Sequence, residues 1–403
     1  MKKIINFASD LTMNFTPEIS DVQLSLLISA TALTLIAAIA ILFRIVPLRR
    51  HFKHCNNVAD DRSDLPRAAV IIFARDDYDS LAELLPQVLN QRYEPGFEVI
   101  VVNDGDSIEV REVVEQFMFA HKNLYFTAAP DGARNLSRKK LALTLGIKAA
   151  KSPVVVHTTS SARIPSADWL KNIMKHFRPE GNVDVVIGYA CAPAYDDTSF
   201  GARARSFDSV AHDLGWVAPA AAGKAWSGTE SNLAYRRDIF FENKGFSRHL
   251  NLRDGDDDIF VSEISHRGNT VLELCNDAFV EVPGANSSRA LNDRIGRRRF
   301  TKRFISSRPR LAGMISAAAY SLAPIPWVAS LFFGTFDLLG WIYFGIIALL
   351  WYSVGLLWNP AVRILRGRKL LLSTPMLAFT RPVRILHRTA ASMLRKNKRY
   401  TWE

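Results

Sequence analysis

Three long segments without charged side chains constrain the fold of this chain more than any other feature. Residues 24–43 carry no charge, and residues 311–336 and 338–362 are uncharged as well. A helix rises about 1.5 Å per residue, so about 20 residues cross the roughly 30 Å hydrocarbon core of a bilayer. We therefore predict one N-terminal transmembrane helix and a C-terminal hairpin of two. Prolines should kink the first helix of that hairpin at Pro324 and Pro326.

Basic residues next to these segments predict the orientation of the chain. They cluster in residues 44–53, 294–310 and 363–369. With three spans, all three clusters fall on one side, so the positive-inside rule places residues 44–310 and the C-terminal tail in the cytoplasm. The polar stretch that precedes the first span argues for an uncleaved anchor rather than a signal peptide. We expect a multi-pass protein of the inner (plasma) membrane.

The charge is distributed unevenly along the chain. The formal net charge is +12, yet residues 54–291 carry a net charge of −7. The positive charge therefore lies beside the predicted spans, where it meets anionic lipid head groups, and nucleic-acid binding is disfavoured. A hydrophobic content of 48% excludes an intrinsically disordered chain. The three cysteines show neither metal-ligand nor redox spacing, which suits a reducing compartment; they are Cys55, Cys191 and Cys275.

These features divide the chain into seven predicted parts. They are an extracytoplasmic segment (1–21), a transmembrane helix (22–44), a basic juxtamembrane linker (45–65), a folded domain (66–290), a basic amphipathic interface helix (291–310), a transmembrane hairpin (311–360) and a basic cytoplasmic tail (361–403).

Within the folded domain, short apolar runs alternate with helix-like stretches. The predicted strands are 68–73, 97–102, 124–126, 153–157 and 183–188, and the predicted helices are 80–91, 110–120 and 139–150. In the last helix we expect Leu141, Leu145 and Ile147 to face inward. This alternation predicts a doubly wound α/β sheet, which binds ligands beyond the carboxyl ends of its strands. Neither a Gly-x-Gly-x-x-Gly motif nor a P-loop follows the first strand, so dinucleotide and P-loop readings lose their support.

A polar turn, residues 103–107, follows the second predicted strand at this ligand-binding edge. Its carboxylates can accept hydrogen bonds from a nucleobase or a ribose hydroxyl. An ordinary strand-terminating turn has the same composition.

The order of several motifs resembles the family 2 glycosyltransferases of the GT-A fold. The motifs lie at residues 74–77, 103–107, 137–151, 165–170, 228–236 and 255–258, and the resemblance covers roughly residues 66–304. It implies a GT-A mixed sheet with one N-terminal and two C-terminal transmembrane helices. It also implies a nucleotide-sugar donor, UDP- or GDP-linked. The donor-binding residues that we predict are Ala74, Asp76, Asp104, Asp106, Lys140, Arg163 and Arg299. Lys139 and Lys140 are both placed to approach the nucleotide phosphates, and a charged face on a surface helix is the alternative for both.

The family's Asp-x-Asp, which holds Mn²⁺ or Mg²⁺ against the donor diphosphate, is altered. Thr159 and Ser161 stand where the aspartates belong. Neutral hydroxyls are poor anchors for a hard divalent cation, and the metal ligands stay unidentified. Arg163 is the nearest replacement as a phosphate ligand, because a guanidinium pairs bidentately with phosphate; a surface arginine is the alternative.

The family's Gln-x-x-Arg-Trp motif is eroded to residues 296–300, which keep Arg299 and an aromatic ring. This erosion argues against polysaccharide synthesis of the cellulose or hyaluronan type. We interpret most of this stretch as an amphipathic helix on lipid, and Arg299 as a possible phosphate contact.

Three consecutive acids, Asp256, Asp257 and Asp258, precede an apolar run and should open a helix. Capping at the helix dipole accounts for one or two of them. By resemblance, we assign Asp257 as the general base that deprotonates the acceptor hydroxyl, with Asp256 and Asp258 as its neighbours. The resemblance also implies acceptor contacts at Gly228 and Asn232. Trp226 precedes this loop and is a candidate to stack on an acceptor sugar, as aromatic rings do in carbohydrate sites; burial is the alternative for Trp226.

Two functions follow as hypotheses. The first is an inverting transferase that moves a sugar to a lipid-linked or glycan acceptor at the inner leaflet. The second is an inactive relative that serves as a scaffold or subunit for a membrane-protein partner, motivated by the changed metal motif. Nucleotide binding discriminates between them.

Overall fold

The computed structural model describes residues 20–57, 64–104, 107–129, 136–179, 181–193, 199–285, 287–305, 311–333, 336 and 338–394. The chain forms two compact units. One comprises Met1–Phe43, Leu311–Asn359 and Leu371–Leu386; the other comprises Arg44–Arg310, Pro360–Leu370 and His387–Glu403.

A mixed sheet forms the centre of the second unit. Its described strands are β1 (Ala68–Ala74), β2 (Phe97–Asn103), β3 (Leu124–Ala128), β4 (Val154–Thr159), β5 (Val185–Ile187), β7 (Leu233–Arg236) and β8 (Thr270–Leu272), in the order β3-β2-β1-β4-β7-β5-β8. Strand β7 runs antiparallel to β4 and β5, whereas the other neighbours are parallel. A separate parallel pair joins β6 (Ala190–Cys191) to β9 (Val280–Glu281).

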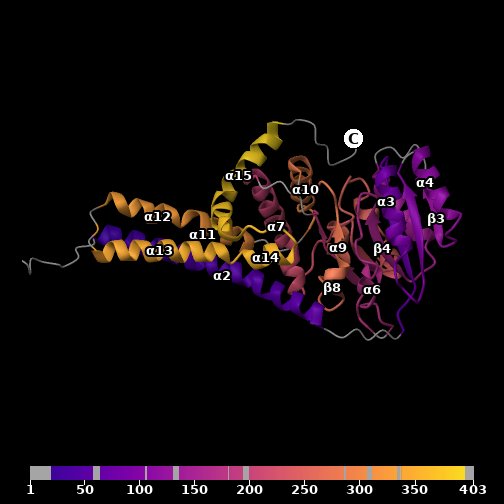
Figure 1. Ribbon diagram of the computed structural model, residues 1–403, viewed down its shortest axis with the longest axis horizontal. Helices are drawn as coiled ribbons and strands as arrows, with labels where there is room; N and C mark the ends of the chain where they lie inside the picture. The colour runs from indigo at the N-terminus through magenta and orange to yellow at the C-terminus, as the bar shows by residue number, and fades with distance from the viewer. Residues whose placement is uncertain are drawn as a thin grey trace, which may run out of the picture. The chain divides into compact units, whose positions relative to one another are not determined.

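Helices accompany this sheet (Figure 1). They are α3 (Tyr78–Leu89), α4 (Ile108–Met118), α5 (Arg138–Ala149), α6 (Trp169–Met174), α7 (Phe200–Ala221), α8 (Arg237–Glu242), α9 (Ile259–Ile264) and α10 (Ser288–Thr301), with 3₁₀ turns at Ser247–His249 and Asn276–Ala278. The parallel strands with crossover helices confirm the predicted α/β architecture, and the strand and helix bounds differ from the prediction by a few residues.

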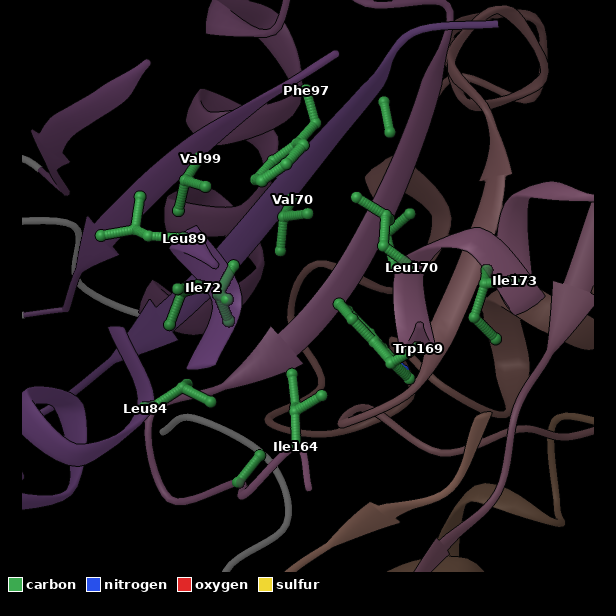
Figure 2. Packing of buried hydrophobic residues seen from close by; sticks show 14 of the residues in the cluster. Val70, Ile72, Leu84, Leu89, Phe97, Val99, Ile164, Trp169, Leu170 and Ile173 are labelled. Carbon is green, nitrogen blue, oxygen red and sulfur yellow. The ribbon is translucent and has the colours of Figure 1, made fainter. Parts of the chain in front are cut away.

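The core explains why these strands are continuous apolar runs rather than alternating ones. Every residue of β2 is buried, as is nearly every residue of β1, because helices cover both faces of the sheet. On one face, Val70 and Ile72 of β1 pack with Leu84 of α3 and with Trp169 and Leu170 of α6 (Figure 2).

The inward face of α5 differs from the prediction. Ala142, Leu143, Gly146 and Ile147 are buried, whereas Leu141 and Leu145 are only half-buried. The helix lies so close to the sheet that a Cβ atom at Gly146 would be 2.7 Å from Cγ2 of Val102. Small residues therefore face the strands.

The first unit, and the segments that continue from it, are helical. The helices are α2 (Asp21–Asn57), α11 (Leu311–Leu322), α12 (Pro324–Ala329), α13 (Leu338–Leu356), α14 (Asn359–Ile364) and α15 (Thr374–Leu394), with 3₁₀ turns at Ser330–Phe332 and Leu371–Ser373. Among the described residues, three helices are long and apolar enough to cross a membrane: Asp21–Asn56, Gly313–Phe332 and Leu338–Ile364. They match the three predicted spans.

The first half of α2, α12 and α13 pack against one another within this unit (Figure 1). Leu27 and Ala30 of α2 contact Ile347 of α13, with Trp327 of α12 beside them. The helix is interrupted at Ala323, directly before Pro324, where the kink was predicted.

Candidate active site

A cleft of about 240 Å³ opens at the carboxyl ends of β1, β2 and β4. The residues that follow these strands form one wall. The loops after α7 and α8, together with α10, form the other. The lining residues are Phe73, Arg75, Asp77, Asp104, Ser137, Lys139, Thr159, Ser160, Ser161, Glu230, Arg253, Asp254 and Arg297. The cleft lies where a doubly wound sheet places its ligand.

Asp104 follows β2 and lies in the cleft, as predicted for a donor-binding residue. Its carboxylate is buried and accepts from Arg138 Nε at 2.9 Å, with Arg75 Nη1 at 3.7 Å. Ala74 contributes through its backbone, since its carbonyl oxygen accepts from the Asp104 N–H at 2.9 Å. Asp106 lies outside the described residues.

After β1, Asp77 rather than the predicted Asp76 faces the cleft. Asp76 adopts a φ of +54°, and its side chain is 73% exposed and absent from the cleft lining. The Asp77 carboxylate accepts from Ser160 Oγ at 2.5 Å and from the Arg75 N–H at 3.1 Å. Because of the turn at Asp76, Asp77 occupies the place in the cleft that we predicted for Asp76. A sequence pattern does not resolve a shift of one residue.

On α5, Lys139 and Lys140 are adjacent in sequence but lie in different surroundings. Lys140, the predicted phosphate contact, is fully buried, and its Nζ donates to the carbonyl oxygens of His249, Leu252 and Asp254 at 2.7, 3.1 and 2.9 Å. Burial lowers the pKa of Lys140 to about 8. Lys140 therefore fixes the loop 249–254 and does not reach the cleft.

Lys139 lies in the cleft instead. Its Nζ is 2.7 Å from Asp256 Oδ2 and also contacts the Glu230 carboxylate. Burial by itself favours the neutral amine, but Asp256 and Glu230 outweigh it and raise the pKa of Lys139. Lys139 is therefore a fixed positive charge.

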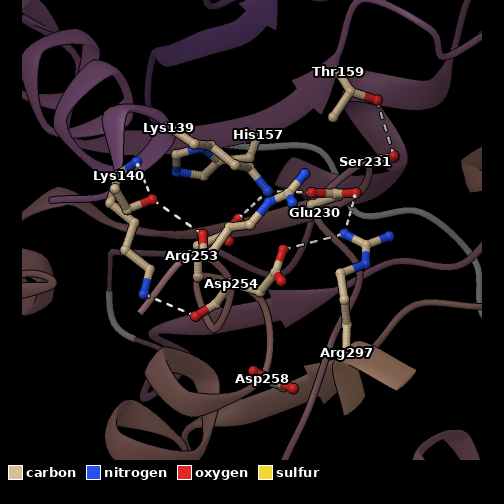
Figure 3. Close-up of polar contacts among 12 residues, drawn as sticks. Lys139, Lys140, His157, Thr159, Glu230, Ser231, Arg253, Asp254, Asp258 and Arg297 are labelled. Atoms are coloured by element: carbon tan, nitrogen blue, oxygen red, sulfur yellow. Dashed lines mark hydrogen bonds and ion pairs between the residues drawn. The ribbon is translucent and has the colours of Figure 1, made fainter. Parts of the chain in front are cut away.

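The sequence reasoning missed several charged residues that line the cleft, which are Glu230, Arg253, Asp254 and Arg297. Arg297 Nη1 lies 3.6 Å from Glu230 Oε1 and 3.6 Å from Asp254 Oδ1, and Figure 3 shows Lys139 and Arg297 reaching Glu230 from different elements. The adjacent Lys139 ammonium, opposed by burial and helped by Arg297, lowers the pKa of Glu230 to about 2. Glu230 is therefore ionised at neutral pH.

The three arginines of α10 point in different directions, because successive helical residues are about 100° apart. Arg297 lines the cleft. Arg298 is buried and donates from Nη2 to the Gly228 carbonyl oxygen at 2.6 Å. Arg299, the predicted phosphate contact, is exposed and donates to Thr389 Oγ1 at 2.9 Å. The candidate phosphate ligand on this helix is thus Arg297.

Thr159 and Ser161 line the cleft, and Thr159 Oγ1 lies 3.0 Å from Ser231 Oγ. Arg163 does not line it. Its exposed guanidinium donates from Nη2 to Glu83 Oε2 at 2.8 Å, which fits the surface alternative.

The acidic trio lies at the start of α9, as expected. Asp258 caps this helix: it is buried and accepts from the Ile259 N–H at 2.7 Å and from the Thr301 hydroxyl. Asp256 is buried against Lys139. Gly255, with φ +116°, turns the chain into the trio, and a Cβ there would lie 2.7 Å from Ile259 Cδ1.

Asp257 is half-buried, and its backbone carbonyl oxygen accepts from the Gly228 N–H at 2.7 Å. Burial, then the charges of Asp258 and Asp256, raise the pKa of Asp257 well above its ordinary value, while Arg298 opposes this rise. A partly accessible carboxylate of raised pKa is a stronger base than an ordinary one once it is ionised.

The predicted acceptor residues are not among those that line the cleft. Asn232 is fully buried; its Nδ2 donates to the carbonyl oxygens of Tyr189 and Ala278, and its Oδ1 accepts from Trp169 Nε1. Trp226 is 4% exposed, with Lys302 Nζ 5.8 Å from its ring centroid, which fits the burial alternative. Gly228 contributes backbone contacts alone.

Comparison with known proteins yields a family match and structural similarities. Residues 69–240 match the sequence profile of Glycosyl transferase family 2. No curated protein sequence matches the chain. The mannosyltransferase PcManGT from Pyrobaculum calidifontis, solved in complex with GDP-Man and Mn²⁺, is 20% identical with a TM-score of 0.54. The match covers 88% of this chain and 97% of that protein, and it shows the fold.

Two structures of S. aureus TarS are more distant. One matches 63% of this chain and 43% of TarS at 15% identity, with a TM-score of 0.40. The other, TarS 1-349 in complex with UDP, matches 78% of this chain and 91% of that one at 14% identity, with a TM-score of 0.40.

Proposed function

Residues 69–240 form a family 2 glycosyltransferase domain of the GT-A fold, and from this premise we propose that the chain is a membrane-anchored inverting glycosyltransferase. It takes a sugar from a nucleotide-sugar donor and transfers it to a lipid-linked or glycan acceptor at the cytoplasmic face of the membrane. We expect a UDP- or GDP-linked donor, and the GDP-Man bound to PcManGT supports a donor of this class.

The placement of Asp257 carries this proposal. It is the half-buried member of the trio, whereas Asp256 is ion-paired with Lys139 and Asp258 caps α9. The hydrogen bond from Gly228 to the Asp257 carbonyl fixes the loop that presents the carboxylate. Asp257 is not among the cleft-lining residues, but it is the member of the trio whose carboxylate is engaged by neither an ion pair nor a helix cap among the described residues.

The reaction then needs one proton transfer and one displacement. Asp257 accepts the proton of the acceptor hydroxyl as its oxygen attacks the anomeric carbon from the face opposite the leaving group. A new carbon–oxygen bond forms, the bond to the diphosphate breaks, and its electron pair leaves with the diphosphate. The configuration at the anomeric carbon inverts.

The predicted membrane helices support the proposal of a lipid-linked or glycan acceptor. Three helices suit a membrane by length and composition, and the basic residues that flank them favour the cytoplasmic side for the catalytic domain. Membrane lipids and a lipid-linked or glycan acceptor are therefore the proposed partners, with no role for nucleic acid.

The test is sugar turnover by the purified full chain in detergent, with a panel of UDP- and GDP-sugars and a lipid extract as acceptor. We expect turnover with one donor and a loss of about 10²–10⁴-fold in Asp257→Asn, the usual contribution of a general base. Asp76→Asn removes an exposed carboxylate outside the cleft and should keep full activity. Equal rates for wild type and Asp257→Asn refute the assignment.

The second candidate is an inactive relative that acts as a scaffold or subunit of a membrane assembly. The hydroxyls of Thr159 and Ser161 at the positions of the expected aspartates favour it. Nucleotide binding separates the two functions, because an enzyme must bind its donor and a pure scaffold need not. Absence of both binding and turnover across the donor panel would favour the scaffold.

A further inference from the structure

The described part of the cleft offers hydroxyls where a divalent cation needs charged oxygens. Thr159 Oγ1 lies 3.0 Å from Ser231 Oγ and 3.5 Å from Ser161 Oγ, so these groups hydrogen-bond with one another. Mg²⁺ and Mn²⁺ prefer carboxylate ligands. Among the described residues, no group of three or more His, Cys, Asp and Glu side chains is placed to hold a metal ion. These residues do not fit the metal that the fold family implies.

Three of the four carboxylates that line the cleft are already engaged by cations of the chain, and the fourth, Asp77, accepts from Ser160 Oγ and the Arg75 N–H. Asp104 is paired with Arg138 at 2.9 Å. Glu230 contacts Lys139, and its other oxygen lies 3.6 Å from Arg297, which is also 3.6 Å from Asp254. A metal ion would have to displace these ion pairs before it gained its ligands.

Arg253 differs from the other cations of the cleft. It is exposed and lines the cleft, and its guanidinium makes no ion pair with any residue that the structure describes. Its backbone is nevertheless held, because its carbonyl oxygen accepts from Ser137 Oγ at 3.0 Å. Lys140 binds the carbonyl oxygen of the neighbouring Leu252. It also binds that of Asp254 (Figure 3). A fixed loop thus presents an available guanidinium.

We propose that the cleft binds the diphosphate of the donor without a divalent cation, through Arg253 and Arg297, with Lys139 as a fixed charge behind them. This inference rests on the proposed transferase function and names how its donor is held. Four basic side chains line the cleft, and among the described residues Arg253 is the one without an ion-pair partner, so Arg253 is available to supply the positive charge that the diphosphate needs. A guanidinium supplies it with two parallel hydrogen bonds to phosphate oxygens.

The test is calorimetric titration of the purified full chain with UDP, UMP, GDP and GMP, in EDTA and again with Mn²⁺. We expect one diphosphate to bind with the same affinity, within twofold, in both conditions. Arg253→Gln should weaken that diphosphate on the order of tenfold, the usual scale for a hydrogen bond to a charged group, and should leave the monophosphate unchanged. Arg253 is exposed, so this variant should fold; a melting curve checks it.

Arg299→Gln is the charge-matched control, because Arg299 is exposed, lies outside the cleft and contacts Thr389. Its diphosphate affinity should equal that of wild type. If Arg253→Gln also equals wild type, the assignment of Arg253 is overturned. Diphosphate binding that needs Mn²⁺ overturns metal-free binding but leaves the transferase proposal standing, whereas absence of binding in every condition removes both.

A double variant tests the inference in the opposite direction, because it should make diphosphate binding depend on a metal ion. Thr159→Asp combined with Ser161→Asp places two carboxylates in the cleft. We expect this protein to bind the diphosphate at least tenfold more weakly than wild type in EDTA, through charge repulsion, and to recover affinity with Mn²⁺. Equal affinities for both proteins in EDTA would contradict the proposed location of the diphosphate.

Discussion

A Cβ atom on Gly188 would lie 2.3 Å from Cγ of Asn232, so the chain between β5 and β6 passes directly over that amide. Asn232 in turn binds Trp169 Nε1 and the carbonyl oxygens of Tyr189 and Ala278 at 3.1, 3.1 and 2.8 Å. One side chain thus joins α6 to the loops that follow β5 and β8.

Asn232→Ala should therefore act on stability rather than on the acceptor. It leaves Trp169 Nε1 and the Ala278 carbonyl oxygen without their partner, whereas the Tyr189 carbonyl oxygen keeps the Val280 N–H; each unpaired buried group costs about 1–3 kcal/mol. Even about 2 kcal/mol lowers Tm by roughly 4–8 °C in a domain of this size. Thermal melts of the purified variant measure this, with Asn90→Ala, exposed at the end of α3, as control. A wild-type Tm combined with a raised KM for the acceptor would instead restore the sequence-based assignment.

Lys140→Met should loosen the loop that carries Arg253 and Asp254. The carbonyl oxygens of His249, Leu252 and Asp254 lose their shared donor, so we expect a lower Tm and nucleoside diphosphate affinity reduced on the order of tenfold. Lys148→Met, exposed on the same helix, should change neither quantity. Calorimetry and thermal melts report both, and unchanged nucleotide affinity in Lys140→Met would show that the loop does not contact the donor.

The architecture could be predicted from sequence patterns alone. The apolar runs of β1, β2 and β4 read as buried parallel strands because both faces are covered, and the uncharged segments read as long helices. Asp104 was placed in the cleft because a residue that follows a parallel strand lies at the ligand-binding edge whatever its rotamer. Position along the chain was sufficient for these inferences.

The direction of individual side chains was not predictable in the same way. Lys139 and Lys140 are adjacent in sequence, but one reaches the cleft and the other reaches a loop that contacts α5 only in the folded chain. The same holds for Arg297 and Arg299 on α10. A charged side chain takes the direction in which its partners lie, and those partners are distant in sequence.

The ion pairs of Glu230 should make the stability of the folded domain depend on pH. The pKa of Glu230 is about 2 in the folded chain, below its ordinary value of 4.5, so its charged form stabilises the fold. That contribution is present above pH 4.5 and is lost as pH falls through about 2. We expect Glu230→Gln to lower Tm at pH 7 and the gap from wild type to narrow between pH 4.5 and 2. A gap that stays constant with pH would contradict this.

Glu83→Gln provides the matched comparison for Glu230→Gln. The Glu83 side chain is 59% exposed and pairs with the exposed Arg163. Exposed ion pairs contribute little, so its Tm should stay close to wild type across the same pH range.

The pH dependence of transfer tests the assignment of Asp257 as the base. Burial and the neighbouring acids raise the pKa of Asp257 above the ordinary value, so the acid limb of kcat/KM should lie above the range of an exposed aspartate. Arg298 opposes that rise, and Arg298→Gln should therefore move the limb to higher pH. Arg299→Gln removes an equal charge from the exposed side of α10 and should leave the limb where it is. Initial rates between pH 4 and 9 measure the three profiles. Identical acid limbs in all three would mean that the titrating base is not coupled to Arg298, and the carboxylate beside it would lose its assigned role.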